Sequence, residues 1–172
     1  MILGMSTSTF TLVHVLISLA GIGSGFIVLY GLLNGKLLSG WNPIFLVTTI
    51  LTSATGFLFP VEHLLPSHKV GILSLIVLAV AVLALFSFKL AGRWRTVYVI
   101  SAVIALYLNC FVAVVQSFLK IPALHALAPT QTEAPFLVAQ TIVLLLFVVL
   151  GIRAGKRFRS VPQPVVIHSR AA

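Results

Sequence analysis

The sequence predicts an all-α integral membrane protein built as a single bundle of five transmembrane helices. Of the 172 residues, 60% are hydrophobic and only 8% are charged, and the mean hydropathy is +1.19. A water-soluble domain cannot cover its surface with so few charged side chains. The length fits one domain, so we expect a transmembrane domain over residues 1–160 and a flexible basic tail over residues 161–172.

Five apolar runs, separated by short polar segments, define the expected helices. They cover residues 10–33, 41–60, 70–88, 95–119 and 135–155. The first run follows Ser6–Thr9, a row of hydroxyl residues that can cap a helix. At about 1.5 Å per residue, its 24 residues exceed the membrane hydrocarbon thickness of about 30 Å. Asn34-Gly35 then provides turn chemistry, and Pro43 suits the first turn of the second helix.

The distribution of Lys and Arg predicts the orientation of the bundle. Five spans place nine of the eleven basic residues on one side, and only Lys69 and Lys120 on the other. The positive-inside rule makes the side with nine cytoplasmic, so the C-terminus is expected in the cytoplasm and the N-terminus outside. Trp41 and Trp94 then lie at the cytoplasmic interface, where amphipathic aromatic side chains are common.

The same distribution argues against a nucleic-acid partner. The net charge of +9 is spread between apolar runs and forms no basic stripe interleaved with aromatic residues. The expected partner is the lipid bilayer of a bacterial inner membrane, with a second copy or a membrane subunit as further partners. Cys110, the single cysteine, is expected to be a buried, inert thiol. The first apolar run lacks a preceding Lys or Arg and is too long for a secretory signal.

Both acidic residues and four of the five histidines gather on the predicted outer side, and His168 lies in the tail. The stretch 59–69 contains Glu62, His63 and His68, and the loop 120–135 contains His125 and Glu133. His14 lies about one turn inside the first helix at the same end, and an ionisable residue inside the membrane marks a candidate site. We expect the two loops to form a lid over this end, and His14 to point inward near Gln140.

Small and polar residues follow one face of several helices. On the first helix this face holds His14, Ser18, Gly21 and Gly25. On the second it holds Thr49, Ser53, Gly56 and Pro60, and on the fourth Ser101, Ala105, Asn109 and Gln116. Lipid offers such groups no partner, so these faces are expected to turn toward protein. A Gly-x-x-x-Gly pair such as Gly21 and Gly25 permits close helix approach.

Two kinds of chemistry fit these polar residues. His14, Gln116, Gln140 and Glu133 are a candidate quinone site, in which donors bind the head-group carbonyls and a titratable group moves protons. His63, His68, His125 and Glu62 are candidate ligands for zinc or copper. Haem is less well supported, because only His14 lies clearly within a span. The spacing matches no metalloprotease motif.

The alternative is a structural or accessory membrane subunit, in which the same groups serve only helix packing. Asn109 and Gln140 suit interhelical hydrogen bonds as well as they suit a ligand. The chain has no Asp, which excludes a Ser-His-Asp set, and Gly21-Ile22-Gly23-Ser24-Gly25 lies within a membrane helix, which excludes a nucleotide fingerprint. The chain resembles small multi-pass bacterial membrane proteins, and this resemblance implies no site residues.

Overall fold

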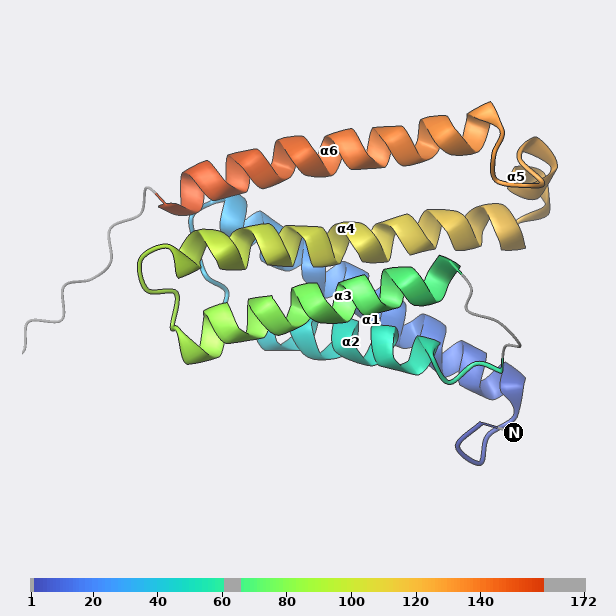
Figure 1. Ribbon diagram of the computed structural model, residues 1–172, viewed down its shortest axis with the longest axis horizontal. Coiled ribbons are helices and arrows are strands. Elements are labelled where there is room, and N and C mark those ends of the chain that lie inside the picture. Colours follow the sequence, from blue (N-terminus) through green and yellow to red (C-terminus); the bar gives the residue numbers. More distant parts are fainter. Residues whose placement is uncertain (1, 61–65, 160–172) are drawn as a thin grey trace, which may run out of the picture.

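The computed structural model describes residues 2–60 and 66–159, and these residues are helical apart from short turns. Figure 1 shows the long helices running side by side in alternating directions. The elements are α1 (Thr7–Leu33), α2 (Trp41–Gly56), α3 (Pro66–Val82), the π-helical turn η1 (Leu83–Ser87), α4 (Trp94–Lys120), the short α5 (Pro122–Leu127) and α6 (Ala134–Arg159). Ser6 caps α1 by accepting a hydrogen bond from the Thr9 amide at 3.1 Å, as the sequence predicted.

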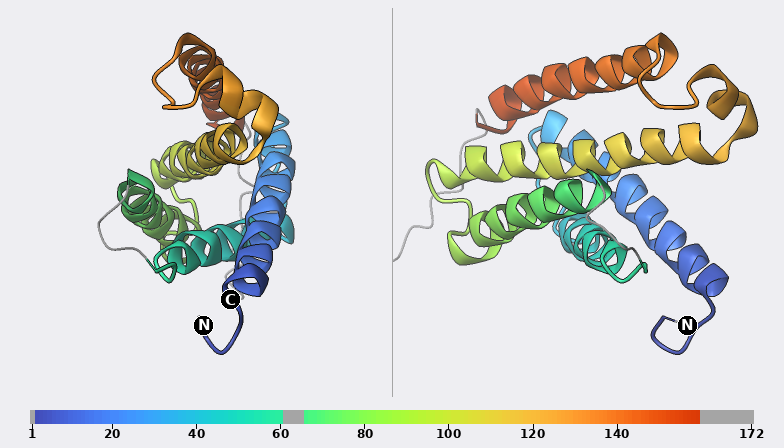
Figure 2. Two further views of the ribbon diagram at one scale, coloured as in Figure 1. Left: turned by 90° about the vertical axis from the view of Figure 1, so that its right-hand side faces the viewer. Right: turned by 45° about the vertical axis from the view of Figure 1, so that its right-hand side comes forward.

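The helices form a group of four with a fifth long helix on one edge. α2 packs on α1 and α3, α4 packs on α3 and α1, and α6 packs on α4 and α1. Figure 2 shows α6 on the side of α4 that faces away from α2. The N-terminal half of α1 diverges from α6, so the two helices approach each other only toward their C-terminal ends.

Four helices of the described chain are long and apolar enough to cross a membrane, whereas the sequence predicted five. They are α1, α3 continued by η1, α4 and α6. The exception is α2, which ends at Gly56 instead of residue 60. Its 16 residues reach about 24 Å, short of the hydrocarbon thickness of about 30 Å. Pro60 disfavours helical backbone before it, and Phe57 and Leu58 donate to Ala54 and Thr55 in tighter turns.

The central core lies where α1, α2 and α4 meet. Phe45 of α2 and Leu106 of α4 are almost fully buried there. A Cβ atom added to Gly25 would lie 2.5 Å from Leu106 Cδ1 and 2.8 Å from Phe45 Cε2, so the missing side chain is what allows this contact. At Gly21 the fit is less tight, with an added Cβ atom 3.3 Å from Thr49 Oγ1 and 3.4 Å from Asn109 Nδ2. The predicted small face of the first helix is therefore confirmed as a packing face.

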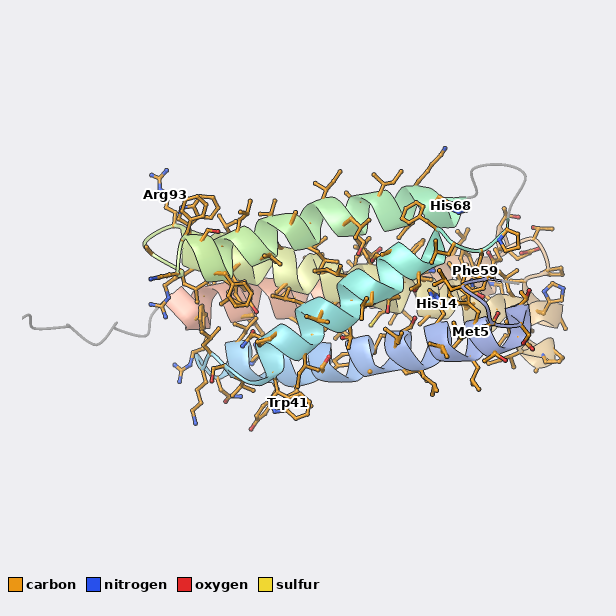
Figure 3. All side chains as sticks on the ribbon, turned by 90° about the horizontal axis from the view of Figure 1, so that it is seen from below. Met5, His14, Trp41, Phe59, His68 and Arg93 are labelled. Atoms are coloured by element: carbon orange, nitrogen blue, oxygen red, sulfur yellow. The ribbon has the colours of Figure 1, made fainter. Side chains whose placement is uncertain are left out.

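The two ends of the bundle differ in chemistry. One end, here named the basic end, is where α1, η1 and α6 finish and where α2 and α4 begin. It holds Lys36, Lys89, Arg93, Arg95, Arg153, Lys156 and Arg157. At this end the Trp94 indole stacks on Phe88 with ring centroids 3.7 Å apart. Figure 3 shows Arg93 and Trp41 at the basic end and His14, Phe59 and His68 at the other, here named the histidine end.

Substitution of Gly25 tests the closeness of this packing. We expect Gly25→Val to lower the free energy of unfolding by about 1–3 kcal/mol, because its methyl groups would overlap Leu106 and Phe45. Gly23→Ala is the matched control, since nothing lies within 4 Å of a Cβ atom there. It should be neutral or stabilising by up to about 1 kcal/mol. Equal effects of both substitutions in an SDS unfolding titration would contradict this packing.

Candidate functional site

The short helix α2 carries a row of polar side chains that each pair with a neighbouring helix. Asn42 accepts a hydrogen bond from the Tyr98 hydroxyl of α4, and both side chains are at least 98% buried. Thr49 accepts from the Asn109 amide of α4 at 3.3 Å. Nearer the histidine end, the remaining pairs are Ser53 with Ser74 of α3 at 2.9 Å and Thr55 with His14 of α1 at 2.8 Å.

The geometry at Thr55 determines the tautomer of His14. The Thr55 hydroxyl lies 2.6 Å from the Leu51 carbonyl, to which it donates its single proton. It can therefore only accept from His14, so Nδ1 of the neutral ring carries the proton. The second ring nitrogen, Nε2, is then left with a lone pair and acts as a hydrogen-bond acceptor.

One aromatic ring packs directly on His14, which is half-buried. The Phe59 ring meets the imidazole edge to face with centroids 5.2 Å apart, and Phe10 packs on Phe59 at 5.0 Å. The predicted position near the end of the second helix is confirmed. The predicted proximity to Gln140 is wrong, because the N-terminal half of α1 leads away from α6 (Figure 2).

Gln140 instead joins α6 to α4. Its Nε2 donates to the Phe111 carbonyl at 3.2 Å, and its side chain is 91% buried. Its Oε1 is also buried and has no hydrogen-bond partner among the described residues. An unpaired buried carbonyl costs free energy, so this amide is only half satisfied by helix packing. Asn109 and Gln140 both form the interhelical bonds that the packing interpretation predicted.

The candidate metal ligands do not come together in the described part of the chain. No group of three or more His, Cys, Asp or Glu side chains there is arranged to hold a metal ion. Glu62 and His63 lie outside the described residues. His68 lies in the first turn of α3, because this helix begins at Pro66 instead of residue 70. It is buried against Phe57, with ring centroids 5.4 Å apart.

The other predicted ligands lie on α4 and on the connection between α4 and α6. His125 is exposed on α5, and Gln116 is exposed on α4. Phe118 of α4, Ala128 after α5 and Phe136 of α6 form a second apolar cluster that seats this connection on the two helices. The expected lid also required Glu62 and His63, so that prediction falls on residues outside the described chain.

Glu133 organises the start of α6 rather than a ligand site. Its carboxylate accepts hydrogen bonds from the Thr130 amide and hydroxyl and from the Thr132 amide, at 2.9 to 3.1 Å. Desolvation acts to raise the pKa of Glu133, but these hydrogen bonds outweigh it and lower the pKa below its ordinary value. Nearby, Gln131 donates from its side chain to the Val115 carbonyl at 2.9 Å, which ties the loop to α4.

Sequence reasoning missed the Asn42–Tyr98 pair. Neither residue belonged to the predicted polar faces, although an Asn one residue after Trp41 and a Tyr one turn after Trp94 begin two helices at the same end. Their matching depth was the available signal. Comparisons of the chain with protein-family models, with curated proteins and with solved structures give no match.

Replacing Asn109 and Gln140 by leucine, one at a time, tests whether their side-chain amides contribute differently to stability. We expect Asn109→Leu to cost about 1–3 kcal/mol of unfolding free energy, because it leaves the buried Thr49 hydroxyl without its partner. Gln140→Leu should be neutral or stabilising by up to about 1 kcal/mol, because it removes the unpaired Oε1. SDS unfolding titrations of both variants check this, and a larger loss for Gln140→Leu would contradict it.

The hydrogen bonds of Glu133 predict a pH dependence of the loop before α6. Because the folded pKa lies below the ordinary value of 4.5, the carboxylate stabilises the loop above that pH and loses this effect as pH falls through the folded pKa. The amide chemical shifts of Thr130 and Thr132 should titrate with a midpoint below 4.5. Glu133→Gln should abolish the titration. A midpoint at or above 4.5 would show that the bonds do not favour the charged form.

Proposed function

We propose that this chain is an accessory or structural subunit of the bacterial inner membrane, with polar groups that hold its own helices together. The observation that supports this proposal is the row of pairs along α2, in which four polar side chains each bond to a side chain of another helix. The side-chain atoms engaged in these pairs can bind a ligand only by giving up the partner that they already have.

The face through which such a subunit meets its partner is the outer side of α6. Within the described chain this helix packs mainly on α4 and α1, and its apolar side chains Ile142 and Leu145 are 61% and 58% exposed. Lipid tails cover such a face in a free subunit. A partner helix covers it in an assembly, where close packing rather than the hydrophobic effect drives the association.

A quinol site at His14 is the second candidate, because one observation favours it. The Nδ1–H tautomer presents Nε2 as a base, beside the Phe59 ring. A quinol hydroxyl would donate to Nε2, and on oxidation to the quinone its proton would pass to the imidazole and that of the second hydroxyl to water. Of the predicted set His14, Gln116, Gln140 and Glu133, only His14 has this arrangement. The electrons would pass to a redox partner subunit.

One purification distinguishes the two functions. We expect protein extracted with its native lipids to contain much less than one quinone, metal ion or haem per chain. We also expect a partner subunit to remain bound at a fixed ratio. Absorption spectra, metal analysis and solvent extraction measure the first, and native mass spectrometry the second. Quinone bound near one per chain and lost in His14→Ala would overturn the accessory proposal and support the quinol site. Phe10→Leu is the control for loss of folding, because it alters the ring that packs on Phe59 and leaves His14 unchanged.

We further propose that the chain crosses the membrane five times, with the N-terminus outside and the C-terminus in the cytoplasm. The support is that α2 runs antiparallel to α1 and α3 within the bundle (Figure 1). If α2 did not cross, the basic groups at 89–95 and 153–157 would lie on the opposite side of the membrane from Lys36. Five crossings place all of them in the cytoplasm.

Labelling of single cysteines tests the number of crossings directly. In a Cys110→Ser background, Thr132→Cys should react with a membrane-impermeant maleimide added to intact spheroplasts, and Ser39→Cys should react only after lysis. Both positions are exposed and lie at opposite ends of the bundle. If α2 does not cross, residues 39 and 132 lie on the same side, so equal labelling of the two variants would contradict five crossings.

A further inference from the structure

At the basic end, α1 and α6 border an open groove of about 700 Å³. On the α6 side it is lined by Leu150, Arg153, Lys156 and Arg157. On the α1 side it is lined by Tyr30, Leu33 and Asn34. The groove therefore lies at the last turns of two membrane-spanning helices, at the depth where apolar side chains give way to charged ones.

The spacing of the lining residues explains why they meet. Arg153, Lys156 and Arg157 follow one another at i, i+3 and i+4, which places them on one face of α6. Tyr30, Leu33 and Asn34 have the same spacing on α1. Higher in the bundle, Phe26 and Phe147 hold the two helices together with ring centroids 6.2 Å apart. The two faces thus lie opposite each other, with the cations near the C-terminal end of α6.

The lining combines strong positive charge with apolar surface. Arg153 and Lys156 are exposed, and none of the described residues that line the groove is acidic. Glu133, the acidic residue of the described chain, lies at the opposite end of the bundle. Leu33 and Leu150 supply the apolar part of the lining. An anion with a hydrophobic tail complements both parts of this surface, whereas a soluble anion complements only the outer part.

We propose that this groove binds the headgroup of an anionic phospholipid. The guanidinium and ammonium groups of α6 contact the phosphate, and the acyl chains run past Leu33 and Leu150 along the exposed side of α6. Basic pockets between membrane helices bind anionic headgroups in this way. Cations at a helix C-terminus also favour the helix dipole, but that effect involves α6 alone and gives no preference among lipids.

Native mass spectrometry of the full chain in detergent tests this site with two defined probes. These are dimyristoyl phosphatidylglycerol, which is anionic, and dimyristoyl phosphatidylcholine, which has the same tails and no net charge. We expect the protein to retain phosphatidylglycerol preferentially, as one tightly held copy. Arg153→Gln with Lys156→Gln should lower that preference at least about fivefold, since each cation near an anionic headgroup contributes about that factor.

Lys89→Gln with Arg93→Gln is the matched control, because it removes two exposed charges from the same end outside the groove. This double variant should keep the lipid preference. An equal loss in both double variants would show a diffuse effect of charge, and no loss in either would show that the groove does not select lipid. Either result would overturn the proposal. Displacement of the lipid by millimolar inorganic phosphate would also overturn it, because the tail would then contribute nothing.

Discussion

Lipid supplies no hydrogen-bond partner, so a polar side chain inside the membrane is stabilised when it finds one within the bundle. The short helix α2 provides hydrogen-bond partners for polar side chains of the neighbouring helices. Its residues Asn42 and Thr49 bond to α4, and Ser53 and Thr55 bond to α3 and α1. Each bond fixes both the depth and the rotation of the helix that it reaches. The arrangement of the four-helix group therefore depends on the shortest of its helices, which has 16 residues.

Small residues allow these bonds to form. Gly21 of α1 lies so close to α2 and α4 that a Cβ atom there would be 3.3 Å from Thr49 and 3.4 Å from Asn109. Gly25 admits Leu106 and Phe45 one turn further along. Dispersion contacts and hydrogen bonds act together at this point, as they do generally where membrane helices pack without a hydrophobic driving force. α6 lies outside this polar network except for the single amide of Gln140.

Much of this arrangement could be predicted from the sequence, and the rest depends on distances that no pattern contains. The hydropathy runs locate every long helix, and the Gly21–Gly25 face predicts where α1 packs. The sequence does not reveal that α2 ends at Gly56, because residues 57–59 are apolar and continue the run. It also cannot distinguish Gln140 from Thr55 as the partner of His14. Both lie at a similar depth, and only the divergence of α1 from α6 decides between them.

The most direct test of this arrangement is a double-mutant cycle on Asn42 and Tyr98, with unfolding free energies measured in micelles for Asn42→Leu, Tyr98→Phe and the double variant. Tyr98→Phe removes only the hydroxyl of a fully buried ring. If polar pairs along α2 hold the bundle together, the coupling energy should be about 0.6–1.7 kcal/mol in favour of the pair. Strictly additive effects of the two substitutions would contradict that role for α2.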